Sequence, residues 1–140
     1  MNIKNYRCLG LIILGGFLLL SCSSESVSIK PNTLPTGFID GANYEKESFY
    51  AVGWAADEED GSPVKSVTVY IDNNPIGEAK LGINRPGVAT EMKKPNWDKS
   101  GWEIHARVSL SKGLHTAYAV VVDKTGAVAK GMNEIKFEVK

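Results

Sequence analysis

Hydrophobic and polar residues alternate with a period of two along most of the chain from Leu34 onward. No stretch of about ten residues there repeats with the 3.6-residue period of an amphipathic helix. Gly, Asn and Pro separate the alternating segments, as expected for strands joined by turns. The pattern predicts seven short strands, at residues 37–40, 48–56, 64–72, 76–81, 102–110, 114–123 and 134–140.

The alternation also predicts which side of each strand is buried. In residues 48–56 one face carries Phe49, Ala51, Gly53 and Ala55, and the other carries Tyr50, Val52 and Trp54. Residues 102–110 alternate apolar with polar in the same way, so one face should pack on a core and the other should face water. The strand count predicts an all-β, immunoglobulin-like antiparallel β-sandwich. The Cys…Trp…Cys spacing of antibody domains is absent.

Residues 82–102 interrupt this pattern with a long segment that has neither period. Connections of this length inside a domain are uncommon and are often functional. Trp54 points to the face of its strand that should be solvated, so the segment could fold back and cover it. Otherwise Tyr50, Trp54 and Tyr70 would form an exposed aromatic patch, which is typical of a binding surface. The sequence leaves both interpretations open.

The chemistry of this segment permits ligand contact as well as packing. Lys93, Lys94 and Lys99 make its middle basic, Trp97 and Trp102 stand beside them, and Arg85 stands near the start. An exposed tryptophan beside cations suits a sugar or another polymer. Trp54, Arg85 and Trp97 are therefore the candidate ligand-contacting residues.

The N-terminus has the parts of an export signal: the basic segment MNIKNYR, the apolar run CLGLIILGGFLLL and then small polar residues. The apolar run is shorter than the roughly 20 residues of a membrane-spanning helix. The following LLSC, ending at Cys22, resembles the lipobox of bacterial lipoproteins. The resemblance implies a signal peptide at residues 1–21 and diacylglycerol on the Cys22 sulfur. The alternative is an ordinary secretory signal in which Cys22 happens to lie near the cleavage site.

Cysteine usage favours the lipoprotein. Cys8 leaves with the leader, so Cys22 would be the single cysteine of the mature chain, without a disulfide partner. Residues 22–33 are rich in serine and form an expected tether, followed by a domain at residues 34–140. In Gram-negative bacteria, by resemblance to lipoprotein sorting, Ser23 after the lipidated cysteine favours the outer membrane.

The domain itself resembles the immunoglobulin-like and fibronectin type III-like modules of exported bacterial proteins. The resemblance rests on GWAADEEDGSPVKSVTVYIDNNPIGEA, RPGVA, SGWEI and KGLHTAYAVVVDKTG, in that order. It implies that His115 takes the part of the corner tyrosine of related sandwiches and that Arg85 packs. Gly87 stands where those modules commonly carry Asp, which leaves the partner of Arg85 open. The module implies a fold and an extracytoplasmic setting, but no activity.

Charge and candidate chemistry exclude several function classes. With Lys4 and Arg7 in the leader, the part from Cys22 onward has 14 basic and 16 acidic residues, which gives no basic footprint for nucleic acid. The histidines lack a placed nucleophile, and no carboxylate pair is held across a cleft, so we expect no enzyme and no cofactor. Asp57 and Asp60 of the acidic loop, with Asp123 at the same pole, are weak calcium candidates against an ordinary solvated turn.

The sequence therefore predicts a monomeric lipoprotein, exported and anchored to the bacterial cell envelope by palmitate or similar acyl chains. Its single domain would be a non-catalytic interaction or scaffold module with a protein partner. The alternative is a carbohydrate-binding module that contacts envelope or host glycan through Trp54 and Trp97.

Overall fold

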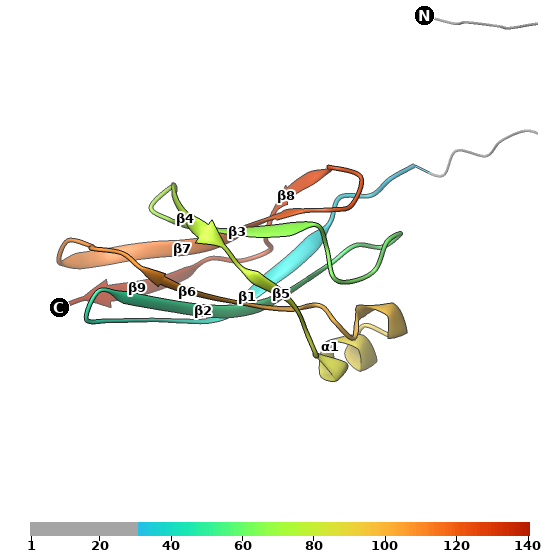
Figure 1. The fold of residues 1–140 in the computed structure, drawn as a ribbon, viewed down its shortest axis with the longest axis horizontal. Coiled ribbons are helices and arrows are strands. Elements are labelled where there is room, and N and C mark those ends of the chain that lie inside the picture. Colours follow the sequence, from blue (N-terminus) through green and yellow to red (C-terminus); the bar gives the residue numbers. More distant parts are fainter. Residues whose placement is uncertain (1–30) are drawn as a thin grey trace, which may run out of the picture. The chain divides into compact units, whose positions relative to one another are not determined.

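Two antiparallel sheets packed face to face make up the part of the chain that the structure describes, residues 31–140 (Figure 1). The structure is a computed structural model. The predicted signal peptide and Cys22 lie outside the described residues, so the anchor stays a prediction. The all-β antiparallel sandwich is confirmed. No helix within residues 31–140 has the length and apolar character needed to span a membrane.

The first sheet has the strand order β1-β2-β6-β5. Its strands are β1 (Thr36–Glu45), β2 (Ser48–Ala56), β6 (Gly101–Arg107) and β5 (Lys80–Ile83). The inward face of β2 is the predicted one, since Phe49, Ala51 and Ala55 are buried in the core. The register pairs Gly53 of β2 with Trp102 of β6. A Cβ on Gly53 would lie 2.4 Å from Cζ2 of Trp102, so glycine lets that indole lie against the strand.

The second sheet has the order β4-β3-β7-β8, and β9 also pairs with β7. Its strands are β3 (Ser66–Ile71), β4 (Asn74–Glu78), β7 (Gly113–Val122), β8 (Val128–Lys130) and β9 (Ile135–Val139). Val67, Val69 and Ile71 face inward as their alternation predicts. With Trp102, Phe49 and Val121 they fill the space between the sheets.

Residues 31–140 contain nine strands where the pattern predicts seven. The expected strand 76–81 is divided at Ala79: β4 pairs with β3 of the second sheet, whereas β5 pairs with β6 of the first. The first strand extends to Glu45 because Lys46 and Glu47 adopt positive φ angles and turn the chain directly into β2. The short β8 follows the turn at Gly126. Alternation identifies extended segments, but it does not indicate which sheet each one joins.

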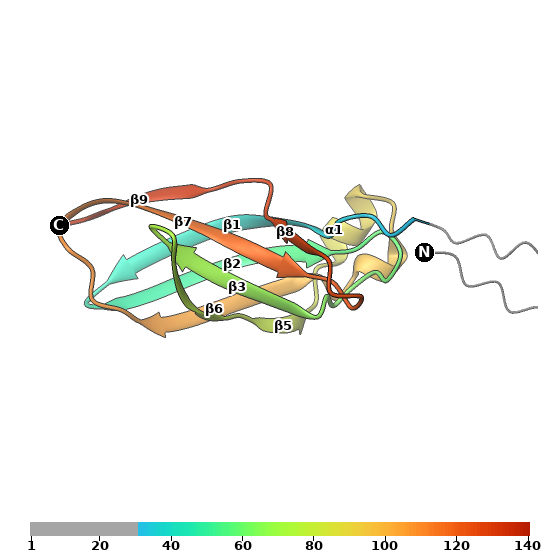
Figure 2. The same ribbon diagram turned by 90° about the horizontal axis from the view of Figure 1, so that it is seen from above.

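The segment 82–102 contains two short helical turns, α1 (Pro86–Glu91) and the 3₁₀ turn Pro95–Trp97. Each begins with a proline, whose fixed φ and missing N–H suit the first position of a helix. Both turns are too short to produce a helical period in the sequence, which explains why the pattern predicts only an irregular loop. They lie at the end of the sandwich where β1 begins, away from the C-terminus (Figure 2).

Candidate functional site

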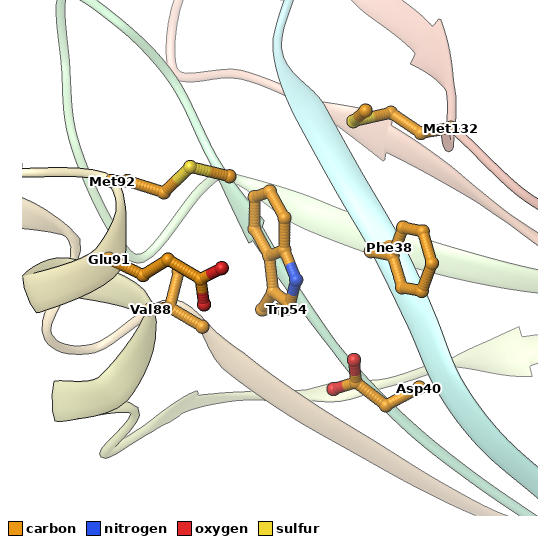
Figure 3. A pocket seen from close by; sticks show the side chains of 7 residues that line it. All are labelled: Phe38, Asp40, Trp54, Val88, Glu91, Met92 and Met132. Carbon is orange, nitrogen blue, oxygen red and sulfur yellow. The ribbon is translucent and has the colours of Figure 1, made fainter.

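A groove lies on the outer side of the first sheet, between α1 and β1 (Figure 3). Trp54 of β2 lies between the α1 side, with Val88, and the β1 side, with Phe38. The cavity volume is about 300 Å³, at the lower end of the range for ligand pockets. The full lining comprises Phe38, Asp40, Trp54, Val88, Glu91, Met92 and Met132.

The segment 82–102 folds over the outward face of β2, so of the two interpretations that the sequence leaves open the structure has the one in which the segment covers Trp54. The Trp54 indole is 7 % exposed and Trp97 is 5 % exposed, with ring centroids 5.9 Å apart. Val88, Ala89 and Ala56 complete this second apolar cluster, with Phe38 packed at its side. A tryptophan that would otherwise face water is thus buried by its own chain, and the remaining edge of its ring lines the groove.

Hydrogen bonds hold the segment in place. Trp97 Nε1 donates to the carbonyl oxygen of Asp57 at 3.0 Å inside the cluster. Backbone amides join the segment to β2 and to the acidic loop, since Ala55 N donates to Ser100 O and Ser62 N donates to Asn96 O, both at 2.9 Å. These bonds satisfy polar groups that the cover would otherwise bury unpaired.

Arg85 anchors the start of α1 to the sheet. Its guanidinium Nη1 donates to Asp40 Oδ2 on β1 at 2.7 Å and to the carbonyl oxygen of Gly53 at 3.4 Å. From the sequence, the partner of Arg85 is open because Gly87 stands where related modules carry Asp. In the structure the partner of Arg85 is Asp40, a residue 45 positions away. Arg85 therefore has the packing role implied by the resemblance, and its charge is already paired.

The three candidate ligand-contacting residues are brought close together, but they occupy different environments. Trp54 lines the groove, Arg85 supports one wall through Asp40, and Trp97 lies behind Trp54 in the buried cluster. The groove residues that the sequence analysis missed are Phe38, Asp40, Val88, Glu91, Met92 and Met132. Met132 comes from the connection between β8 and β9, so no local pattern links it to α1.

The other outward aromatics do not join Trp54 in one patch. Tyr50, on the same face of β2, packs on His105 with ring centroids 4.4 Å apart. Tyr70 belongs to the second sheet, where its ring stacks on Tyr118 at 5.2 Å and 4°. The ammonium of Lys130 lies 4.2 Å from the Tyr118 centroid and covers it further. These ring faces contact neighbouring side chains.

Two of the calcium candidates, Asp57 and Asp123, act as turn caps. Asp57 Oδ1 accepts hydrogen bonds from the backbone amides of Glu59 and Asp60, and Asp123 Oδ1 accepts from Thr125 and Ala127. The two loops do share a pole, since Lys124 Nζ donates to Asp60 O at 3.3 Å. Within residues 31–140 no three acidic, histidine or cysteine side chains are grouped so as to hold a metal ion.

Asp123 is strongly acidic. Burial raises the pKa of its carboxyl, but hydrogen bonds from Asn32, Thr125, Ala127 and Gly126 outweigh burial and lower the pKa to about 2. The carboxylate is therefore ionised at every ordinary pH and supports the turn after β7.

His115 ties the chain at the opposite pole. Its Nε2 lies 2.8 Å from the carbonyl oxygen of Ser111, and its Nδ1 lies 2.5 Å from Asp72 Oδ2. Both partners are acceptors, so the ring is best satisfied when both nitrogens carry protons. The carbonyl of Ser111 and then Asp72 raise the pKa of His115 above 6.5. The Thr116 amide and then His115 lower the pKa of Asp72 below 3.8.

This geometry matches the corner role that the resemblance implies for His115. A tyrosine contributes at the same pole: Tyr44 Oη donates to Val108 O at 3.0 Å and accepts from Leu110 N at 3.2 Å. The sequence pattern singles out neither Tyr44 nor Asp72. Each forms its hydrogen bond with a residue far away in the sequence, Tyr44 with Val108 and Asp72 with His115.

Comparison with known proteins assigns the chain to no family. No family model and no curated protein matches the chain. Among solved structures, the chain is similar to the family 28 exopolygalacturonase of Yersinia enterocolitica, with a TM-score of 0.41 and 9 % identity. The likeness covers 77 % of this chain and 20 % of that enzyme, so the chain spans only a fifth of its length. A likeness this distant carries no argument about activity.

Proposed function

We propose that this protein is a lipid-anchored, non-catalytic interaction domain of the bacterial cell envelope, and that the Trp54 groove receives part of a partner. The observation that carries the proposal is the groove itself, where the thioether side chains of Met92 and Met132 stand 41 % and 68 % exposed beside Trp54. Apolar side chains left exposed around a concave site are typical of binding surfaces. The LLSC motif ending at Cys22 supports the anchor.

Site-specific photo-cross-linking on intact cells tests the interaction. A photoreactive phenylalanine analogue placed at Met92 should give a discrete adduct, because the partner contacts that wall. The same analogue at Leu114, which is 67 % exposed at the other pole, is the matched control and should give none. Equal adducts at the two positions would show that the groove has no special contact and would contradict the proposal.

A carbohydrate-binding module is the second candidate, and one observation favours it: the groove combines the Trp54 indole with the carboxylates of Asp40 and Glu91. An aromatic ring beside acceptor oxygens suits a sugar. Titration of a panel of envelope glycans tests this function. Saturable binding that Glu91→Gln weakens, while Glu138→Gln leaves it unchanged, would favour the glycan over a protein partner.

A further inference from the structure

We infer that the Trp54 groove selects a peptide segment in which an apolar side chain stands beside a lysine or arginine. This inference rests on the proposed function as an interaction domain and specifies the chemistry of the partner. Two properties of the groove carry it: an apolar floor and a rim whose only charged lining residues are acidic.

The floor accounts for the apolar side chain. Trp54, Val88 and Phe38 form a continuous hydrophobic surface whose members are held by the cluster beneath. Met92 and Met132 stand on opposite sides of this floor (Figure 3). Methionine side chains are unbranched and polarizable, so they adapt to apolar groups of different shape. A cavity of about 300 Å³ has room for a side chain and its neighbours, but not for a folded domain.

The rim accounts for the basic residue. Glu91, from the last turn of α1, points its carboxylate toward the indole (Figure 3). Glu91 has no hydrogen bond or ion pair with any side chain within residues 31–140. Asp40 faces it across the groove and is paired with Arg85. A cation entering the groove beside Glu91 would complement the one rim carboxylate whose charge is not already paired.

The nearby lysines do not neutralise the groove. Lys94 pairs with Glu58 of the acidic loop. Lys93 lines a separate hollow with Ala89, Thr90 and Pro95. The two lysines that follow α1 are therefore engaged away from the rim, and Arg85 before it pairs with Asp40, so Glu91 keeps its charge available.

The edge of β1 indicates how the segment binds. The side chain of Asn133 accepts from Ile39 N and donates to Ile39 O, both at 2.9 Å, and Met132 N donates to Gly37 O at 2.8 Å. These bonds occupy the backbone groups of β1 beside the groove, so a peptide cannot extend the sheet there. The partner must bind through its side chains, which makes its apolar and basic groups decisive.

Fluorescence anisotropy with three labelled peptides tests the inference. The first peptide alternates lysine and leucine, the second has glutamate in place of lysine, and the third has serine in place of leucine. The full-length protein is held in phosphatidylcholine nanodiscs, whose zwitterionic surface does not attract the lysines, and empty nanodiscs supply the background. The lysine–leucine peptide should bind about tenfold tighter than the serine peptide, since one buried leucine accounts for a factor of this size. It should also bind severalfold tighter than the glutamate peptide, whose charge has the same sign as that of Glu91.

Two pairs of variants localise the binding. Glu91→Lys should reduce the preference for the lysine–leucine peptide over its glutamate counterpart at least severalfold, and Glu138→Lys, an exposed carboxylate near the C-terminus, should not. Met92→Ser should weaken binding, and Leu114→Ser should not. All four positions are exposed, so the variants should keep the wild-type circular dichroism and melting temperature.

Equal binding of the three peptides, or a Glu91→Lys variant that behaves as wild type, would overturn the inference. If the adduct at Met92 persists in cells while the peptides fail to discriminate, the interaction domain stands and only the partner chemistry is wrong. Concentration-dependent self-association that Met92→Ser abolishes would identify a second copy of this protein as the occupant of the groove. This result would also overturn the inference.

Discussion

At the residue scale, Trp54 links the stability of the domain to its candidate site. The same side chain packs on Trp97 and lines the groove, so a substitution of Trp54 alters both stability and the groove. Glu91 and Met92 differ from it, because both are exposed and contribute to the rim without supporting the cluster. Binding is therefore better tested at the rim, and packing at the floor.

Trp54→Ala should lower the free energy of unfolding by about 3 to 5 kcal/mol, since a buried aromatic is lost and a cavity remains. Urea titration followed by circular dichroism measures the change. Val128→Ala, at an exposed apolar residue, is the control and should change stability by less than about 0.5 kcal/mol. A comparably small loss for Trp54→Ala would show that the indole is not packed in solution.

The pair of His115 and Asp72 should make stability depend on pH. The folded state raises the pKa of His115, so its contribution is complete below about pH 6.5 and is lost as the pH rises through the folded value. The folded state lowers the pKa of Asp72, so its contribution is present above about pH 3.8 and is lost as the pH falls through its folded value. The pair should therefore stabilise the folded state most between about pH 3.8 and about pH 6.5.

Urea titrations at about pH 5 and about pH 8 measure this effect. The wild-type protein should lose stability at the higher pH, and His115→Gln should lose less. His105→Gln removes the chain's other histidine, which is exposed, and should keep the wild-type dependence. A dependence that follows His105 would disprove the assignment.

At the scale of elements, the segment 82–102 and the first sheet share one apolar interface. Neither side buries its tryptophan alone: β2 supplies Trp54, and the 3₁₀ turn supplies Trp97. Arg85 adds a polar tie between the start of α1 and β1 through Asp40. The position of α1, and hence of one wall of the groove, depends on both contacts.

Shortening the segment between Val88 and Lys99 should destabilise the domain about as much as Trp54→Ala. The two losses should fail to add when combined, because each change removes one half of the same interface. Denaturant titrations of the two single variants and their combination give the coupling. Additive, small losses would instead identify a free binding arm, since long surface loops tolerate shortening.

The Arg85–Asp40 pair should have a modest coupling energy. Both side chains are about one third exposed, and pairs of this kind contribute about 0.2 to 1 kcal/mol. A double-mutant cycle with Arg85→Met and Asp40→Asn measures it, and the coupling should decrease in high salt. Lys80→Met with Glu103→Gln, a pair whose lysine is 76 % exposed, is the comparison and should couple less.

At the scale of the whole molecule, the predicted anchor determines where the groove can act. Cys22 should carry the acyl chains, so the wild-type protein should partition with membranes and incorporate labelled palmitate. Cys22→Ser should lose the label and either stay uncleaved or be released by another peptidase. Cys8→Ser, in the leader, is the matched control and should keep the label. Labelling that persists in Cys22→Ser would contradict the lipobox interpretation.

The sequence by itself determined most of the strands and the face that each of these presents. The inward positions of β2 and β3 follow from alternation alone, because neighbouring side chains of a strand point to opposite faces whatever the strand pairs with. The turn at Asp72 and Asn73, both at positive φ, is marked by residues that tolerate this conformation. These features depend on a few consecutive residues and are therefore encoded locally.

Only the tertiary structure decided which distant residues meet. It divided one expected strand between two sheets at Ala79, paired Arg85 with Asp40, and brought Met132 opposite Met92 across Trp54. Each of these contacts joins segments far apart in the chain, and its geometry depends on how the sheets pack and how residues 82–102 close over them. Alternation indicates that Trp54 needs a cover, but the cover and the groove beside it arise only when the fold is complete.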